Sequence, residues 1–217
     1  VVDLWGPDHH EHVGHMTTTL KAFGHEGFRV LIVQICHLTR DGQEVKFSKR
    51  TGNMPSLKEL IEEAGVDPTR ITFAMRKTNS HFNVDIDVLK SQTMDNPFWY
   101  IGYAHARISS ILSEEAALSL EDIDFDMLKE SEEKALALKL LQFPGVVADA
   151  ASGYNPSLVC TYLIELAHGF NTFYHAHHVL QAESEELKHA RLALVAAVQI
   201  VLCNGLSVLG IKAPEKM

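Results

Sequence analysis

Apolar residues follow two different patterns along the chain, and the pattern changes near residue 85. Before that point, two short runs at residues 1–5 and 29–35 are rich in Val, Leu and Ile, which is typical of buried strands. The segment between them, residues 8–23, predicts a helix. A strand, a helix and a second strand in this order predict a βαβ unit with a parallel sheet.

After residue 85 the apolar residues recur at helical spacing. Ile101, Ala104 and Ile108 form one such stripe. We expect a further helix that ends before Pro144, and a short separate helix at residues 145–151. The remaining helices are expected to start at residues 155–157 and to cover residues 186–202. Because the last segment is apolar almost all round, it is predicted to be the central helix of a bundle.

Turn residues divide the first part of the chain further. Residues 37–47 predict a hairpin that turns at Asp41 and Gly42. A helix is expected to follow from about Leu57 and to stop at Gly65. Residues 81–85 are expected to be extended and to link the two parts of the chain.

A basic loop lies between this hairpin and the next helix. Lys46, Lys49 and Arg50 fall within five residues, and Gly52 allows the chain to bend back. Ammonium groups and exposed backbone N–H groups together form a site for an anion such as a triphosphate. The alternative is a solvated basic turn without a ligand.

A second set of candidate residues follows the first strand. Gly6 would let a nucleotide approach the backbone closely, and Asp8 and His9 could bond to it, since ligands bind at the carboxyl ends of parallel strands. Asp8 could equally be a helix cap. His9 also belongs to a cluster of histidines, but no Cys or other obvious fourth ligand accompanies it, so we expect no structural metal.

The first helix after residue 85 carries a polar and aromatic stripe beside its apolar one. Its members are spaced i, i+4, i+7 and i+11, and they are Asn96, Tyr100, Tyr103 and Arg107. Aromatic rings and Arg planes stack on the bases of single-stranded RNA. Tyr174, His178 and Met217 are expected to complete this surface. The alternatives are a packed helix face and, for Met217, a frayed chain end.

Charge, cysteines and hydropathy narrow the class of protein. Residues 1–84 are neutral, whereas residues 85–217 carry nine basic and eighteen acidic side chains, so RNA would have to bind a local face. The three cysteines are far apart in apolar runs, which indicates buried free thiols in a reducing compartment. The apolar run at residues 192–202 is shorter than the ~20 residues of a membrane span, so we expect no membrane partner.

Four stretches resemble arginyl-tRNA synthetases in the same order. The basic loop resembles the KMSKS signature of class I aminoacyl-tRNA synthetases, with Phe47 in place of Met and Arg50 in place of the final Ser. Residues 4–10 (LWGPDHH) resemble a nucleotide-side motif of the family. Residues 95–107 resemble the opening of its helical anticodon-binding domain, and residues 209–217 resemble its C-terminus.

This resemblance implies a fold, a reaction and a set of sites. It implies a partial Rossmann-type nucleotide-binding fold at residues 1–84 and an all-α anticodon-binding domain at residues 85–217. The parent enzyme would activate arginine with ATP and Mg²⁺ and transfer it to tRNA(Arg) in the cytoplasm, without DNA or membrane partners. Lys46 and Lys49 would be catalytic. The residues implied to bind ATP are Gly6, Asp8, His9, Lys46, Ser48 and Lys49. The residues implied to bind tRNA are Asn96, Tyr100, Tyr103, Arg107, Tyr174, His178 and Met217.

The chain departs from the family in what it lacks. It begins within a strand-like run, and it contains neither a HIGH-type motif nor the arginine-pocket residues of the upstream half-fold. We therefore expect a fragment that neither activates arginine nor charges tRNA alone. The alternative from another class is a non-catalytic helical RNA-binding or protein-docking module. A cysteinyl-tRNA synthetase is also possible, although of that family's Cys/His zinc site only Cys36 would be present.

Overall fold

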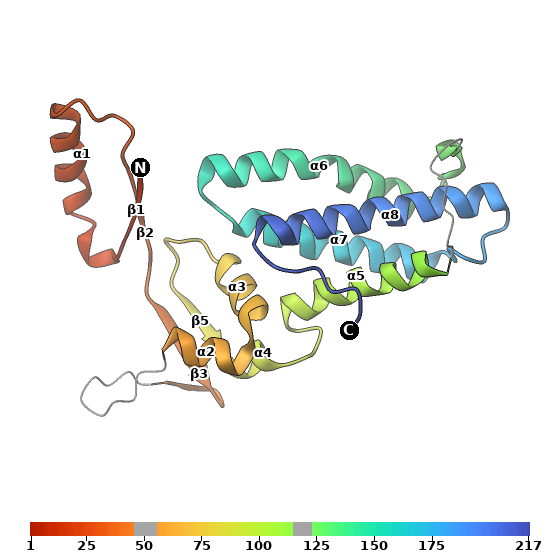
Figure 1. Cartoon of the computed structure of the whole chain (residues 1–217), viewed down its shortest axis with the longest axis horizontal. Coiled ribbons are helices and arrows are strands. Elements are labelled where there is room, and N and C mark those ends of the chain that lie inside the picture. The colour runs from red at the N-terminus through yellow and green to blue at the C-terminus, as the bar shows by residue number, and fades with distance from the viewer. Residues whose placement is uncertain (46–55, 115–122) are drawn as a thin grey trace.

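The computed structural model describes residues 1–45, 56–114 and 123–217. Within these ranges, two small sheets with short helices precede a bundle of long helices (Figure 1). The elements are β1 (Val2–Trp5), the 3₁₀ turn η1 (Pro7–His9), α1 (His12–Ala22), β2 (Arg29–Ile32), β3 (Cys36–Arg40), β4 (Gln43–Glu44), α2 (Leu57–Ala64), α3 (Val66–Ala74), β5 (Phe82–Asp85), α4 (Ile86–Lys90), α5 (Pro97–Ser113), η2 (Phe125–Met127), α6 (Ser131–Gly153), α7 (Ser157–Ala176) and α8 (Glu185–Val208).

The first sheet pairs β1 with β2. The strands run parallel, with Val2 opposite Arg29 and Trp5 opposite Ile32. Helix α1 connects them, and the unit lies at one end of the molecule (Figure 1). The expected strand–helix–strand unit with parallel pairing is therefore present. Both strands are shorter than the apolar runs, and the helix starts at His12 rather than at Asp8.

The second sheet has the order β4–β3–β5. The hairpin between β3 and β4 turns at Asp41 (φ 51°) and Gly42 (φ 70°), the conformation that two-residue hairpin loops favour, so this prediction is confirmed. The expectation for residues 81–85 was incomplete, because these residues are more than a link. They form β5, which pairs in parallel with β3.

Two apolar cores support the fold. Leu38, Leu60 and Val84 form the smaller core together with Ile86 and Leu89 of α4. Helix α2 covers it, begins with a capping box at Ser56 and ends at Gly65 (φ 89°), as expected. The larger core lies in the bundle and also includes Ile71 of α3. A residue from the first part of the chain therefore contributes to the core of the bundle.

Helices α5 to α8 build the bundle. The predicted stripe of α5 is buried. Helix α8 packs against α5, α6 and α7, and α7 likewise packs against α5, α6 and α8, so the two helices share the central position that was expected for residues 186–202 alone. A Cβ atom on Gly205 would lie 2.5 Å from Leu163 Cδ2, so glycine allows α7 and α8 to approach closely. Among the described helices, α6 and α8 are long and apolar enough to span a membrane, and half of that window in α8 is buried in the bundle against 11% in α6.

Helix α6 corrects one prediction. It continues through Pro144 instead of ending before it, so residues 145–151 are not a separate helix. Phe143 and Val146, on either side of the proline, both pack against the bundle core. Tertiary packing on both sides therefore outweighs the backbone hydrogen bond that the proline removes.

The three cysteines differ from one another in exposure. All are free, and Cys160 is buried, but Cys36 is only half-buried and Cys203 is exposed on α8. Burial raises the pKa of the Cys160 thiol to about 12. The expectation of three buried thiols is therefore right for Cys160 and wrong for Cys203.

Candidate functional site

Helices α5 and α7 place polar and aromatic side chains against each other along one face of the bundle. The Tyr100 hydroxyl lies 3.4 Å from His168 Nδ1. One helical turn further along α7, the Asn171 Oδ1 accepts a hydrogen bond of 3.0 Å from Arg107. Since both partner numbers increase together, the helices run in the same direction, and Figure 1 shows them side by side. We call Tyr100, Arg107, His168, Asn171 and Tyr174 the α5–α7 seam.

Arg107 and Tyr174 form the exposed centre of the seam. The Arg107 guanidinium carbon lies 5.4 Å from the centroid of the Tyr174 ring, which is a cation–π contact. The Tyr174 ring stacks on the buried Phe170 at 5.9 Å and 29°, and 37% of Tyr174 is exposed. The arrangement offers a fixed positive charge and a fixed aromatic face to solvent.

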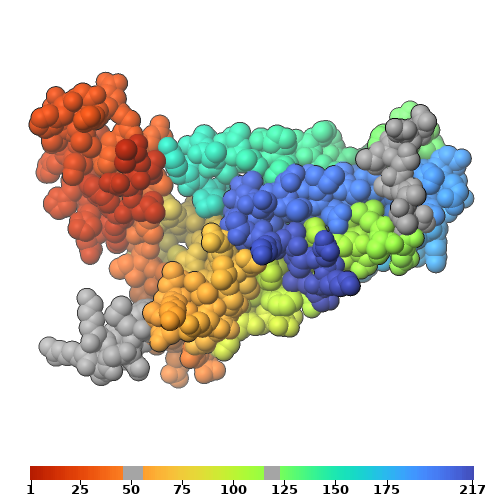
Figure 2. All heavy atoms as spheres, in the orientation of Figure 1, coloured from red at the N-terminus to blue at the C-terminus, as the bar shows by residue number. Residues whose placement is uncertain are grey.

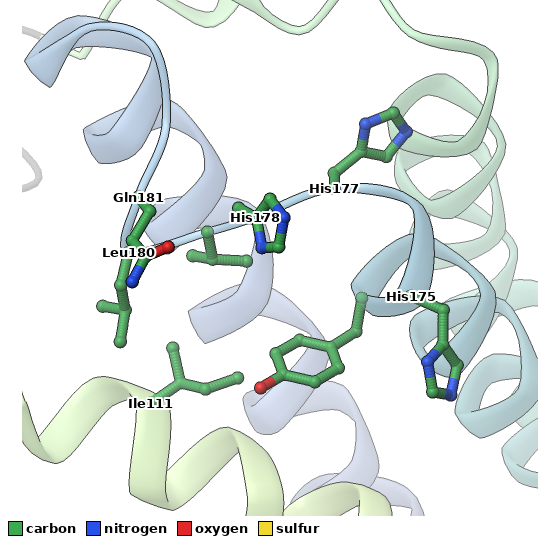
Figure 3. A pocket seen from close by; sticks show the side chains of 8 residues that line it. Ile111, His175, His177, His178, Leu180 and Gln181 are labelled. Atoms are coloured by element: carbon green, nitrogen blue, oxygen red, sulfur yellow. The ribbon is translucent and has the colours of Figure 1, made fainter.

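A cavity of about 350 Å³ continues the seam at the end of α7. Figure 3 shows Ile111 of α5 on one side, and His178, Leu180 and Gln181 on the segment after α7. Tyr174 also lines the cavity. Helix α7 ends at Ala176, so His178 reaches the cavity from the segment that follows the helix.

Met217 also reaches α5, at Gly102, which lies outside the predicted stripe. The last residues of the chain lie on the surface against the α5 side of the bundle (Figure 2). His105, which is 4% exposed, donates from Nδ1 to the Pro214 carbonyl oxygen at 2.8 Å. A Cβ atom on Gly102 would lie 2.6 Å from Met217 Cε, so glycine makes room for this side chain. Tyr103, the next residue, is half-buried with its ring 6.0 Å from that of Trp99.

Asn96 is the predicted tRNA-binding residue that the structure places elsewhere. It is fully buried, and its Oδ1 accepts from the Phe98 N–H as the N-cap of α5. Its amide nitrogen donates to carbonyl groups of α4 and Ser91. Asn96 has no exposed surface, and both its amide nitrogen and its amide oxygen are hydrogen-bonded within the protein. It therefore fixes the start of α5 and cannot contact RNA.

Two residues of the seam, His168 and Asn171, were not foreseen from the sequence. Together with Tyr174 and His178 they are spaced three or four residues apart along the chain. This polar stripe is the signal that could have revealed them.

The candidate nucleotide residues lie at the opposite end of the molecule. Gly6, Asp8 and His9 follow β1 at its carboxyl end, and all three are exposed. A Cβ atom on Gly6 would meet nothing within 4 Å, so space beside this backbone is open. Lys46, Ser48 and Lys49, and with them the whole basic loop, lie outside the described residues.

Gln34 is a further polar residue at this end, and it was missed. It follows β2, and its Oε1 atom is buried without a hydrogen-bond partner among the described residues. A buried acceptor without a donor costs free energy, which a bound ligand could recover. Its sequence signal was a single amide within an apolar run. Within the described ranges, no three His, Cys, Asp or Glu side chains are grouped closely enough to hold a metal ion.

Known proteins resemble the chain along its whole length. It is 44% identical to an arginine–tRNA ligase of Listeria monocytogenes and 45% identical to that of Desulforamulus reducens, each match covering all of this chain and 40% of the relative. The chain thus spans about two fifths of the length of these curated relatives.

Solved structures with a similar fold carry the same family name as these relatives. A Campylobacter jejuni protein named provisionally as an arginyl-tRNA synthetase matches with a TM-score of 0.87 and 26% identity, over all of this chain and 47% of the other. The Thermus thermophilus arginyl-tRNA synthetase shares the fold, with a TM-score of 0.78 and 24% identity, over all of this chain and 41% of that one. The model of the DALR anticodon-binding domain matches residues 101–217, more than half of the chain, and the chain therefore belongs to this family.

Proposed function

We propose that this chain binds the anticodon loop of tRNA(Arg) as part of an arginine–tRNA ligase. The observation that carries the proposal is the α5–α7 seam, where Arg107 lies over the exposed Tyr174 ring beside a cavity of about 350 Å³. Unstacked bases bind to such aromatic and guanidinium planes. The family match over residues 101–217 and the names of the relatives support the same role.

The proposed contacts differ slightly from those expected. Tyr100, Tyr103, Arg107, Tyr174, His178 and Met217 remain in the proposed surface, His168 and Asn171 join it, and Asn96 leaves it because it is buried. Arg107 places a positive charge on this face of an otherwise acidic part of the chain, and a phosphate backbone binds to such a charge.

The proposed division of the chain assigns residues 1–84 to part of a Rossmann-type catalytic domain and residues 85–217 to the anticodon-binding domain. The parallel pair β1–β2 supports the first assignment. Gly6, Asp8 and His9 would contact ATP from the ends of these strands. Lys46, Ser48 and Lys49 would hold its phosphates, with Mg²⁺, and the two lysines would stabilise the charge that grows when arginine is activated. In this proposal the protein acts in the cytoplasm.

Arg107→Ala is expected to weaken the binding of tRNA(Arg) to this chain by about tenfold, the loss typical of one interface arginine. Lys134→Ala, which removes one exposed positive charge from α6, is the matched control and should leave the affinity unchanged. Filter binding or fluorescence anisotropy measures both. Equal affinity of Arg107→Ala and the wild type would remove the seam from the RNA-binding surface.

The chain alone is expected to show no arginine activation. Its 217 residues lack a HIGH-type motif, so ATP would be held from one side only. Arginine-dependent exchange of pyrophosphate into ATP measures activation directly. An exchange rate above background from this chain would contradict the proposal, and the full-length parent is the positive control.

A further inference from the structure

The segment between α7 and α8, residues 177–183, builds one wall of the cavity. His178, Leu180 and Gln181 line it. The side chains of His178 and Gln181 are exposed, whereas Val179 is buried in the bundle core. A wall made by a connecting segment has a defined shape only if its backbone is held from outside.

Arg191 of α8 provides the first such anchor. Its side chain is 9% exposed, and its Nη1 donates to the His178 carbonyl oxygen at 3.0 Å. Its Nε donates to Glu133 Oε1 at 2.7 Å, and the Glu133 side chain is fully buried. Glu133 also accepts from the backbone N–H of Glu130 at the start of α6. One arginine therefore joins α6, α8 and the cavity wall.

Glu132 provides the second anchor, one residue earlier in α6. Its Oε2 lies 3.2 Å from His177 Nε2. His177 also lines the cavity, but Figure 3 shows its ring pointing away from Ile111 and Leu180. The ring lies 5.7 Å from the ring of the buried Phe173. The pKa of the Glu132 carboxyl is held below its usual value by hydrogen bonds from the Glu132 backbone N–H, from the Ser131 hydroxyl and from His177. The carboxyl is therefore an acceptor at neutral pH.

The two anchors act on consecutive residues and leave the cavity side free. Glu132 holds the side chain of His177, and Glu133 acts through Arg191 on the carbonyl of His178. The His178 and Gln181 side chains remain exposed beside Tyr174. A buried ion pair contributes little net stability compared with apolar packing, so stability alone does not account for it. Fixing a backbone in advance lowers the entropy cost of binding a ligand.

We propose that Glu132, Glu133 and Arg191 are positioning residues, which hold residues 177–181 in the conformation that receives RNA at the cavity. This inference rests on the proposed function, since it deepens the account of the same site. Glu132 and Arg191 contact this segment directly and Glu133 acts through Arg191, so the role of all three is to hold the segment and not to bind the RNA.

The test uses Glu132, because it is one-third exposed and its replacement leaves the buried pair intact. Glu132→Ala removes the acceptor for His177. Glu132→Gln removes the same charge but keeps an amide that bonds to the ring. Any change in repulsion of RNA is therefore equal in both, and their difference reports the anchor. The measurements are amide hydrogen exchange of residues 177–181, the melting temperature, and the affinity for a synthetic anticodon stem-loop RNA of tRNA(Arg).

In Glu132→Ala we expect exchange of residues 177–181 to rise and RNA affinity to fall, each by about three- to tenfold, the equivalent of one hydrogen bond. Glu132→Gln should restore both, and the melting temperatures of the two variants should differ by no more than about 2–4 °C, the shift that one hydrogen bond produces in a chain of this size. Equal exchange and equal affinity in the two variants would overturn the proposal, as would faster exchange without a change in affinity. If the wild-type chain binds no RNA while the exchange contrast appears, the proposed function fails and the anchoring role of Glu132 stands.

Discussion

Glu133→Ala is expected to lower the free energy of unfolding by about 3–5 kcal/mol, because it leaves the buried Arg191 guanidinium without its counterion. The same change frees the Glu130 N–H at the start of α6. Urea denaturation followed by circular dichroism measures the loss. Glu62→Ala is the control, since its ion pair with Lys58 is exposed and spans 3.8 Å, and it should change the value by at most about 0.5 kcal/mol.

A double variant separates stability from positioning at this pair. Replacing both Glu133 and Arg191 by Met removes both charges and fills the space with apolar groups, so we expect most of the lost stability to return. The anchor on the His178 carbonyl would still be missing, and residues 177–181 should exchange faster than in the wild type. A loss below about 1 kcal/mol in Glu133→Ala would show that the pair is not held as the structure describes.

The fold could be predicted from the sequence wherever one local pattern dominated. The stripe of Ile101, Ala104 and Ile108 has helical spacing and is buried, and the Asp41–Gly42 dipeptide specifies its turn by local conformation alone. The local rule that a proline ends a helix fails at Pro144, because packing on both sides of this residue keeps α6 continuous. The pairing of β5 with β3 joins segments about 45 residues apart, which no local pattern contains.

The candidate site, too, could be predicted only where a local sequence pattern reveals it. The α5 half could be predicted, because its stripe stands out beside an apolar one. Asn96 was assigned to that stripe by spacing, although an Asn before Pro97 is also a signal for a helix cap, and the cap is what the structure shows. The Arg191–Glu133 pair joins residues 58 positions apart, so only the folded chain reveals that it bears on the cavity.

Phe170→Ala is the second change with a large expected effect. Phe170 is fully buried between the helices of the bundle, and truncating such a ring costs about 3–5 kcal/mol through lost burial and the cavity left behind. Phe23→Ala is the control, because this ring is 76% exposed and its loss should cost about 0.5 kcal/mol or less. Urea denaturation measures both, and similar values for the two variants would contradict the packing described for α7.

Phe170→Leu turns the same position into a test of the binding surface. Leucine keeps most of the apolar volume, so the stability cost should stay below about 1.5 kcal/mol. The ring that stacks under Tyr174 at 5.9 Å is nevertheless gone, and Tyr174 loses the contact that fixes its exposed face below Arg107. Aromatic pairs contribute about 0.5–1.5 kcal/mol beyond burial, so tRNA(Arg) affinity should fall by about two- to tenfold in a chain that remains folded. Unchanged affinity would mean that RNA does not use the Tyr174 ring, even if Arg107 binds it.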